Sequence, residues 1–492
     1  MTNLLVLPMA LPLIIAVLLV FIPSFIYMQR WMTMIVLVTN TIISFLLLQH
    51  VVHQGIISID FGGWEAPFGI SFVGDSFALL LVLITNIVGA ICVLYAMATI
   101  GLDREKLYFY SFVLFLIAGV NGSFLTGDLF NLFVTFEVML LASYALITLG
   151  GTKKQLQESF KYIAINVVSS SLFLIAIAYL YGLLGTLNMA HLSERIAEVG
   201  QTPLLTVVSL LFLLVFSIKS GLLLYQWLPG SYGTPPTAVA ALFGALLTKV
   251  GIYALYRTFT LLFYHEQQLT HTIIGIMAAI TLIGGSIGAI AYKNMRQIVS
   301  YNVVIAVGFI LVALAVMNSV AIEGAIYYLI HDMVVKSLLF LLVGTMIYLT
   351  GSERIGEMSG LIRNYPLLGW MFFITVLSLT GIPPLSGFIG KVLLGIGTIE
   401  TEAYILLGLS FLSGFVVLYS LLRIFMNCFW GETIISEEEE VALPIKILLP
   451  GVLLVLLTIG IGIGVEGLAP YVQDATNTLM NPTVYIDAVL NK

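Results

Sequence analysis

The stretch FSIKSGLLLYQWLPGSYGTPPTAVAALFGALLTKVGIYALYR, residues 216–257, places two lysines in long apolar surroundings. Lys219 and Lys249 each lie near the middle of a run of about 20 apolar residues, the length that an α-helix needs to cross a bilayer. A charge at the centre of a lone membrane helix costs at least about 2.5 kcal/mol. Both lysines must therefore face other polar groups or water inside a bundle. Leu228, Pro229 and Gly230 predict a break in the first of these two helices.

The composition of the whole chain agrees with a membrane location. Its 492 residues are 60% hydrophobic and 9% charged, with a mean hydropathy of +1.10, whereas about a quarter of the residues of a soluble domain are charged. The net charge of −6 and the lack of an arginine cluster exclude nucleic acid as an expected partner. Cys92 and Cys428 are far apart and lack partners at metal-ligand spacing, so we expect no disulfide scaffold, zinc site or iron–sulfur cluster.

We predict an all-α polytopic membrane protein with about fourteen transmembrane helices, counted from runs of roughly 20 apolar residues. The predicted spans are 4–28, 31–50, 76–100, 108–125, 128–149, 160–184, 205–228, 237–262, 272–292, 297–318, 322–349, 367–397, 403–428 and 447–465. The first run has no basic segment before it, so it is predicted to be a span and not a removable signal.

A second broken span suggests an internal repeat. Gly381, Pro383 and Pro384 precede Lys391, and Gly/Pro breaks at corresponding positions of two halves are typical of inverted repeats. The broken spans are the seventh and the twelfth, so we expect two five-helix bundles, spans 4–8 and 9–13, one inverted against the other.

We accordingly divide the chain into four parts. They are an N-terminal unit at 1–107 with three spans and an external hairpin at 56–75, a first half-channel at 108–262, a second half-channel at 272–428, and a segment at 429–492 with an inside acidic loop at 437–440, span 14 and an external tail.

The basic residues predict the orientation, because short cytoplasmic loops carry an excess of Lys and Arg. With the amino terminus outside, most of the 19 Lys and Arg fall in inside loops or at adjoining span ends, while Arg195, Arg257 and Lys492 fall outside. Both termini are therefore expected outside.

Seven ionisable side chains are predicted inside the apolar spans: Glu137, Lys219, Lys249, His331, Asp332, Lys336 and Lys391. Buried singly they would cost about 20 kcal/mol together, so they must line an interior polar path. Lysine suits proton transfer, because burial lowers the pKa of an amine and a nearby carboxylate raises it again. The set predicts a proton relay.

Structural alternatives remain for some of these residues. Asp332 and Lys336 are one helical turn apart and could simply neutralise each other. His331 could be a hydrogen-bonded core histidine, and Glu137 could form a structural ion pair with a lysine.

Four segments resemble the antiporter-like proton channel family, which contains large membrane subunits of respiratory complex I and of Mrp-type sodium/proton antiporters. They are the opening stretch, GDLFNLFVTFEVMLLASYALI at 127–147, YLIHDMVVKSLLFLLVG at 328–344 and SLTGIPPLSGFIGKVLL at 378–394. The resemblance implies that Glu137 modulates Lys219, that Lys249 is the lysine of span 8, and that Lys391 serves the far half-channel. Relatives often carry His four residues before the span 11 lysine; here Asp332 takes that place and His331 is displaced by one.

Within the family, the chain is similar to D subunits of the Mrp antiporter. Complex I relatives usually continue Trp-Leu-Pro with Asp-Ala-His, whereas Pro229 is followed here by Gly-Ser-Tyr and then Gly-Thr-Pro-Pro-Thr. The resemblance implies a multi-pass subunit of the bacterial plasma membrane that is embedded in lipid, works with other Mrp subunits, and exchanges protons for Na⁺ or a similar monovalent cation. It implies a transporter and not an enzyme, with no cofactor and no bound metal.

The leading hypothesis is thus a proton-translocating antiporter subunit. The rival is a proton-pumping membrane subunit of a redox complex, such as complex I or a hydrogenase, which needs the same lysine chain. Na⁺/H⁺ exchange that persists without a redox substrate would favour the antiporter subunit over the subunit of a redox complex.

Overall fold

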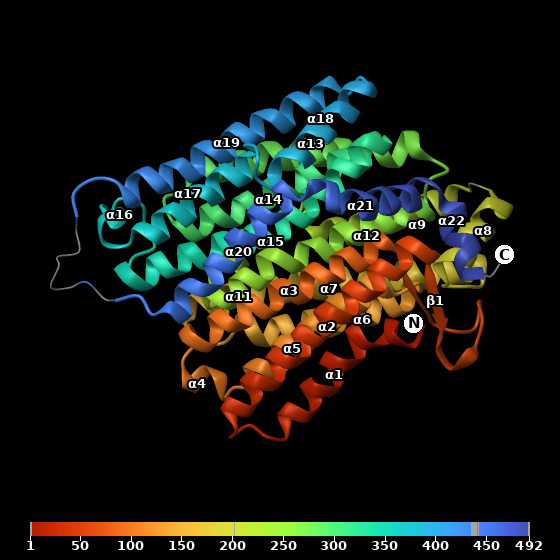
Figure 1. Ribbon diagram of the computed structural model, residues 1–492. Coiled ribbons are helices and arrows are strands. Elements are labelled where there is room, and N and C mark those ends of the chain that lie inside the picture. Colours follow the sequence, from red (N-terminus) through yellow and green to blue (C-terminus); the bar gives the residue numbers. More distant parts are fainter. Residues whose placement is uncertain (1, 201, 434–439, 441, 491–492) are drawn as a thin grey trace.

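A computed structural model of the chain describes residues 2–200, 202–433, 440 and 442–490 (Figure 1). Residues 437–439 of the predicted acidic run lie outside the described residues. The described chain is helical apart from one small hairpin and the connecting loops.

The helices follow the predicted spans closely. The N-terminal and first-half elements are η1 (Thr2–Val6), α1 (Leu7–Val20), α2 (Ile26–Gln54), η2 (Phe61–Gly63), α3 (Ser76–Thr99), α4 (Leu102–Glu105), α5 (Phe109–Leu125), α6 (Leu129–Ile147), α7 (Lys153–Leu184), α8 (Met189–Val199), α9 (Pro203–Ser220), α10 (Leu228–Gly233), α11 (Thr237–Leu242), η3 (Phe243–Leu247) and α12 (Thr248–Leu261). The later elements are α13 (Gln267–Ala291), α14 (Met295–Val316), α15 (Ser319–Thr350), α16 (Leu361–Asn364), α17 (Pro366–Thr380), α18 (Gly387–Glu400), α19 (Tyr404–Phe429), α20 (Ile445–Ile463), α21 (Val465–Met480) and α22 (Pro482–Leu490).

The count of fourteen spans is not confirmed. Among the described residues, twelve helices are long and apolar enough to cross a membrane. Shorter apolar helices, α5 and α17, occupy two further predicted positions. The count differs because α5 has 17 residues and because α17 has 15, ending at the break before α18, so both are shorter than the helices counted as spans.

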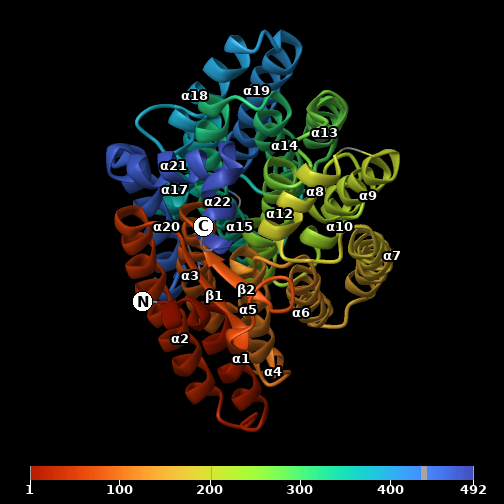
Figure 2. The ribbon, with the colours of Figure 1, turned by 90° about the vertical axis from the view of Figure 1, so that its right-hand side faces the viewer.

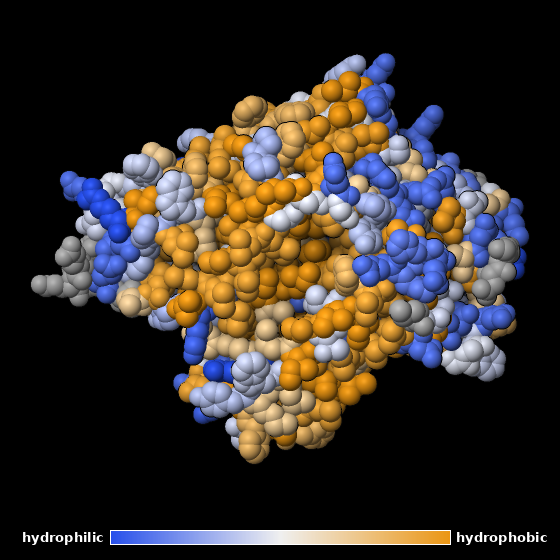
Figure 3. All heavy atoms as spheres, in the orientation of Figure 1, coloured by the Kyte–Doolittle hydropathy of each residue, from blue (hydrophilic) through white to orange (hydrophobic). Residues whose placement is uncertain are grey.

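The membrane-embedded surface is visible on the outside of the molecule. Apolar side chains form a broad band across its middle and polar ones gather at both ends (Figure 3). Large apolar side chains that are exposed include Ile35, Phe160, Ile287 and Phe415. Such a continuous apolar exterior suits lipid or partner helices and would be aberrant in water.

The ends of the bundle differ in their elements. Strands β1 (Ile57–Asp60) and β2 (Ser71–Gly74) form an antiparallel hairpin with Ile57 opposite Gly74. This hairpin lies at the same end as α8, α22 and both chain termini, whereas α4 and α16 lie at the opposite end (Figure 1). The C-terminal helices pack on the chain itself, α21 against α3 and α15, and α22 against β1 and α8.

Viewed along the helices, α12 and α15 lie near the middle of the bundle, with the N-terminal helices on one side and α13, α18 and α19 on the other (Figure 2). This central position is matched by burial, since every residue of α12 is buried. A polar side chain on α12 is therefore enclosed by protein on all sides, as are those of His331, Asp332 and Lys336 on α15.

Both helix breaks are present, but the first lies elsewhere than predicted. Gly221 adopts φ +80° and ends α9 directly after Lys219 and Ser220, whereas Pro229 lies inside the first turn of α10. A left-handed C-terminal glycine ends a helix, while proline is tolerated in a first turn, where its missing N–H is not needed. The break predicted at Leu228-Pro229-Gly230 is thus the start of a new short helix. The second break lies between Gly381 and Gly387, as the sequence predicts.

Candidate functional site

Six helices carry the seven residues predicted from the sequence and one serine, Ser170, that contacts two of them. Glu137 lies on α6, Lys219 on α9, Lys249 on α12 and Lys391 on α18, while α15 carries the other three predicted residues. Five of the seven are at most 4% exposed: Lys219, Lys249, His331, Asp332 and Lys336.

The first cluster joins Glu137 and Lys219 through a serine. Ser170 of α7 donates a short hydrogen bond to Glu137 Oε1, and Lys219 Nζ donates to Ser170 Oγ at 3.2 Å. The ammonium also lies 4.9 Å from the centre of the Phe136 ring, within the range of a cation–π contact. The sequence did not single out Ser170, because one hydroxyl within a run of three serines carries no charge signal.

The end of α9 presents Lys219 to this cluster. Lys219 lies in the last turn of α9, where a cation is favoured by the helix dipole. Gly251 of α12 packs against that end so closely that a Cβ atom there would lie 2.6 Å from the backbone nitrogen of Ser220. This glycine therefore allows α12, with Lys249, to approach α9.

The second cluster is an ion triad between α12 and α15. Asp332 Oδ2 lies 2.7 Å from Lys249 Nζ, and Asp332 Oδ1 lies 3.6 Å from Lys336 Nζ. The one-turn pair considered from the sequence exists, but the closer partner of Asp332 is Lys249. One buried carboxylate thus serves two buried lysines.

A π-helical turn supports the Lys249 end of the triad. In η3 the backbone departs from the α-helical pattern just before Lys249, and Lys249 Nζ donates to the carbonyl oxygen of Gly244 at 2.8 Å. π-turns inside α-helices occur frequently at functional sites. No residue type in this stretch predicts the turn, so sequence reasoning could not find it.

His331 faces away from the triad, toward the second broken helix. Its Nδ1 lies 2.7 Å from the hydroxyl of Ser386, which in turn lies 3.2 Å from the hydroxyl of Ser378. Neighbouring helical residues point about 100° apart, so Asp332 turns to Lys249 while His331 turns to the break between α17 and α18. The structure thereby separates the two residues that the sequence left as alternatives.

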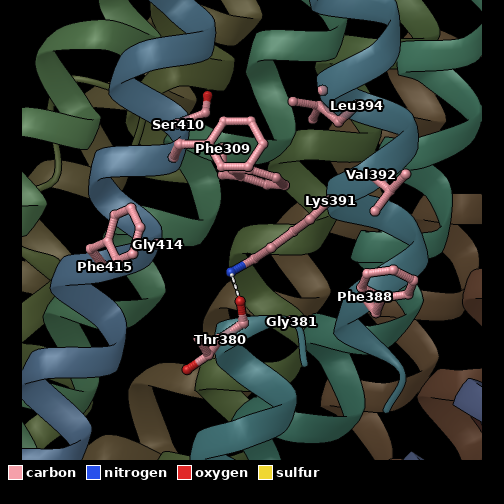
Figure 4. A pocket seen from close by; sticks show the side chains of 12 residues that line it. Phe309, Thr380, Gly381, Phe388, Lys391, Val392, Leu394, Ser410, Gly414 and Phe415 are labelled. Atoms are coloured by element: carbon pink, nitrogen blue, oxygen red, sulfur yellow. Dashed lines mark hydrogen bonds between the residues drawn. The ribbon is translucent and has the colours of Figure 1, made fainter. Parts of the chain in front are cut away.

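Lys391 lies at the same break between α17 and α18. Its Nζ donates to the carbonyl oxygens of Leu379 and Thr380 at 2.8 Å each, the last carbonyls of α17; Figure 4 shows the bond to Thr380. These carbonyls form the negative end of a helix dipole, which favours an ammonium group. The rings of Phe309 and Tyr328 each lie 5.9 Å from Nζ.

A cavity of about 190 Å³ adjoins Lys391 between α18 and α19. Figure 4 shows the lysine side chain extending across this space toward Thr380, with Phe388 and Phe415 at its sides. The lining is mostly apolar, so the ammonium group and the α17 carbonyls are its main polar features.

Comparisons with known proteins identify the family of the chain. Residues 126–416 match the family model described as NADH:quinone oxidoreductase/Mrp antiporter, transmembrane. A relative from Bacillus subtilis (strain 168), named as the D-type subunit of a Na(+)/H(+) antiporter, is 50% identical over 493 residues, with 100% of both chains covered.

Solved structures give the same result. A chain of the Mrp complex from Dietzia sp. DQ12-45-1b superposes with a TM-score of 0.93 at 28% identity, with 100% of both chains covered. A chain of the membrane-bound sulfane sulfur reductase, an archaeal respiratory membrane complex, superposes with a TM-score of 0.91 at 26% identity, with 99% of both chains covered. This chain belongs to the NADH:quinone oxidoreductase/Mrp antiporter transmembrane family.

Proposed function

We propose that this chain is the proton-translocating D-type subunit of a multisubunit Na⁺/H⁺ antiporter. The observation that carries the proposal is the row of polar groups through the apolar bundle, from Glu137 and Lys219 through the Lys249 triad and His331 to Lys391. The relative from Bacillus subtilis, at 50% identity, carries the name of that subunit.

The geometry supports a proton path of alternating carriers and counter-charges. The charge of Glu137 acts on Lys219 through Ser170, and Asp332 is shared by Lys249 and Lys336. Because an ammonium group is stabilised by a nearby carboxylate, a shift of Asp332 between its two lysines changes which of them holds its proton more tightly. His331 and Ser386 extend the path from α15 toward the break beside Lys391.

Further parts of the proposal concern organisation and location. The path divides into a first half-channel at 108–262 and a second at 272–428, flanked by the units at 1–107 and 429–492. The chain lies in the bacterial plasma membrane with both termini outside, and it functions with the other subunits of its complex. It transports ions and catalyses no chemical reaction.

The experiment that tests this function measures Na⁺/H⁺ exchange by the whole complex in everted membrane vesicles. A proton gradient is imposed by a pH jump, without NADH, quinone or other redox substrate, and its collapse on addition of Na⁺ is followed with a pH-sensitive dye. We expect Na⁺-dependent collapse that is absent from vesicles lacking the complex. A requirement for a redox substrate would instead place the chain in an electron-transfer complex.

A further inference from the structure

A proline in α1 frees a backbone carbonyl in the interior of the N-terminal helices. Pro12 lies inside α1 and has no N–H, so the carbonyl of Pro8, four residues earlier, has no partner within the helix. Asn40 Nδ2 of α2 donates to this oxygen at 3.0 Å, and Asn121 Nδ2 of α5 donates to it at 2.8 Å. Both asparagines are fully buried, so three helices meet at one carbonyl inside the bundle.

The amide nitrogens are satisfied there, but the amide oxygens are not. Among the described residues, Asn40 Oδ1 and Asn121 Oδ1 are buried without a hydrogen-bond partner, as is Thr85 Oγ1 of the neighbouring α3. Each unsatisfied buried acceptor costs about 1–3 kcal/mol. Oxygens that lack donors on the chain need an occupant that donates hydrogen bonds or carries positive charge.

Further buried oxygens without hydrogen-bond partners among the described residues lie along α2, toward the end of the bundle that carries α4. Gln29 Oε1 and Thr33 Oγ1 are also buried without a partner in the described chain, and they share one helix face with Asn40. At 1.5 Å per residue, the line from Gln29 to Asn40 covers about 16 Å. It begins beside Arg30, which is paired with Glu105 at 2.7 Å.

The chemistry of these groups differs from that of the lysine row. Amide and aliphatic hydroxyl groups do not load or release protons near neutral pH, so the line cannot repeat the work of the lysines. Uncharged oxygens can replace the hydration shell of a monovalent cation, as carbonyls do in potassium channels. Divalent cations are usually held with carboxylates, which this cluster lacks among its described members.

We propose that Pro8 O, Asn40 Oδ1 and Asn121 Oδ1 form a binding site for a dehydrated monovalent cation, the Na⁺ of the exchange. In the structure both amides present their nitrogens to the Pro8 carbonyl. Rotation about χ2 exchanges each oxygen with its nitrogen, and the bound cation then replaces these two hydrogen bonds. The nitrogens now lie within 3.0 Å of the Pro8 carbonyl, so the rotated amides place three oxygens around one point. This site rests on the function proposed above and places Na⁺ binding where α1 and α2 of the N-terminal unit meet α5.

The test uses the assembled complex with Asn40→Leu, Asn121→Asp and the control Ser44→Ala. Ser44 is buried one turn from Asn40, but its hydroxyl already donates to the Asn40 carbonyl at 2.7 Å. Two quantities are measured: the apparent KM for Na⁺ in exchange, and the Tm of the purified complex with Na⁺ or with choline.

We expect Asn40→Leu to raise the KM for Na⁺ by about tenfold or more, the scale of loss seen when a metal site is disturbed. Asn121→Asp keeps the shape and adds a negative charge, so it should lower this KM and make the Tm rise with Na⁺ and not with choline. Ser44→Ala should leave both quantities unchanged.

An unchanged KM in both asparagine variants, with no Na⁺-dependent Tm in Asn121→Asp, would mean that water alone satisfies these oxygens and would overturn the site. If the Asn40→Leu complex does not assemble, the KM for Na⁺ and the Tm of the isosteric Asn121→Asp variant decide whether the site exists. The Tm measurement does not depend on proton transfer, so it separates failure of this site from failure of the proposed relay.

Discussion

Ser170 is the residue on which contact between Glu137 and Lys219 depends, since it hydrogen-bonds to both. A hydrogen bond to a charged group contributes about 1.5–3 kcal/mol, so we expect Ser170→Ala to lower the exchange rate by about tenfold or more. Ser171→Ala is the control, because that hydroxyl donates to the Val167 carbonyl of its own helix and lies on the exposed face. Equal losses in the two variants would show that the bridge has no special role.

Glu137 is expected to act through its charge. Glu137→Gln should reduce exchange nearly as much as loss of the lysine, whereas Glu137→Asp should retain part of it, because only the second variant keeps a carboxylate to favour the charged form of Lys219. Exchange is to be measured together with the amount of complex in the membrane. Wild-type exchange by a well-expressed Glu137→Gln complex would contradict this role.

Asp332 gives a sharper test of structure against relay. Asp332→Asn leaves two buried lysines without their carboxylate, and removing one partner of a buried pair costs about 3–5 kcal/mol, so we expect little assembled complex. The double variant Asp332→Asn with Lys336→Met removes one of those charges and should recover part of the abundance, because Lys249 still lacks its carboxylate. It should still not exchange, because a proton carrier is lost. Full exchange by the double variant would show that Asp332 and Lys336 form a structural ion pair and carry no protons.

Gly381 matters at the scale of the broken helix. It adopts φ +87°, and an added Cβ would lie 2.8 Å from Cδ of Lys391. Gly381→Ala should therefore strain the break and displace the ammonium group from the α17 carbonyls, with a larger loss of exchange than of abundance. Gly408→Ala on α19 is the control, because a Cβ there meets no atom within 4 Å. Equal exchange by the Gly381→Ala and Gly408→Ala variants would show that the break between α17 and α18 has no role in transport.

The elements also show what the sequence can and cannot predict. Charged residues in apolar spans are conspicuous, so all seven members of the row could be named, and helix positions followed from run length. The pairing of Lys249 with Asp332 could not be predicted, because it joins two helices far apart in the chain. The Gly244 carbonyl and the hydroxyls of Ser170 and Ser386 were missed for another reason: uncharged oxygens are common in membrane helices and become significant only through their neighbours.

At the scale of the whole molecule, the fold separates two kinds of interior. The helices α12 and α15 enclose ionisable groups in contact with one another, whereas α1, α2 and α5 enclose uncharged oxygens around Pro8, Asn40 and Asn121. The apolar band of Figure 3 surrounds both. A proton path and a cation site can thus occupy one subunit without sharing ligands, which would allow the two ions to be coupled through helix movement and not by competition.

The central claim is that protons cross the bundle on the buried lysines, and Lys219→Ala in the assembled complex tests it most directly. Removing this interior charge also removes a desolvation cost, so the variant should insert and assemble at the wild-type level. The measurement is Na⁺/H⁺ exchange in vesicles, normalised to the amount of complex. The account predicts wild-type abundance with exchange reduced to the background of vesicles that lack the complex; normal exchange by the fully assembled variant would contradict it.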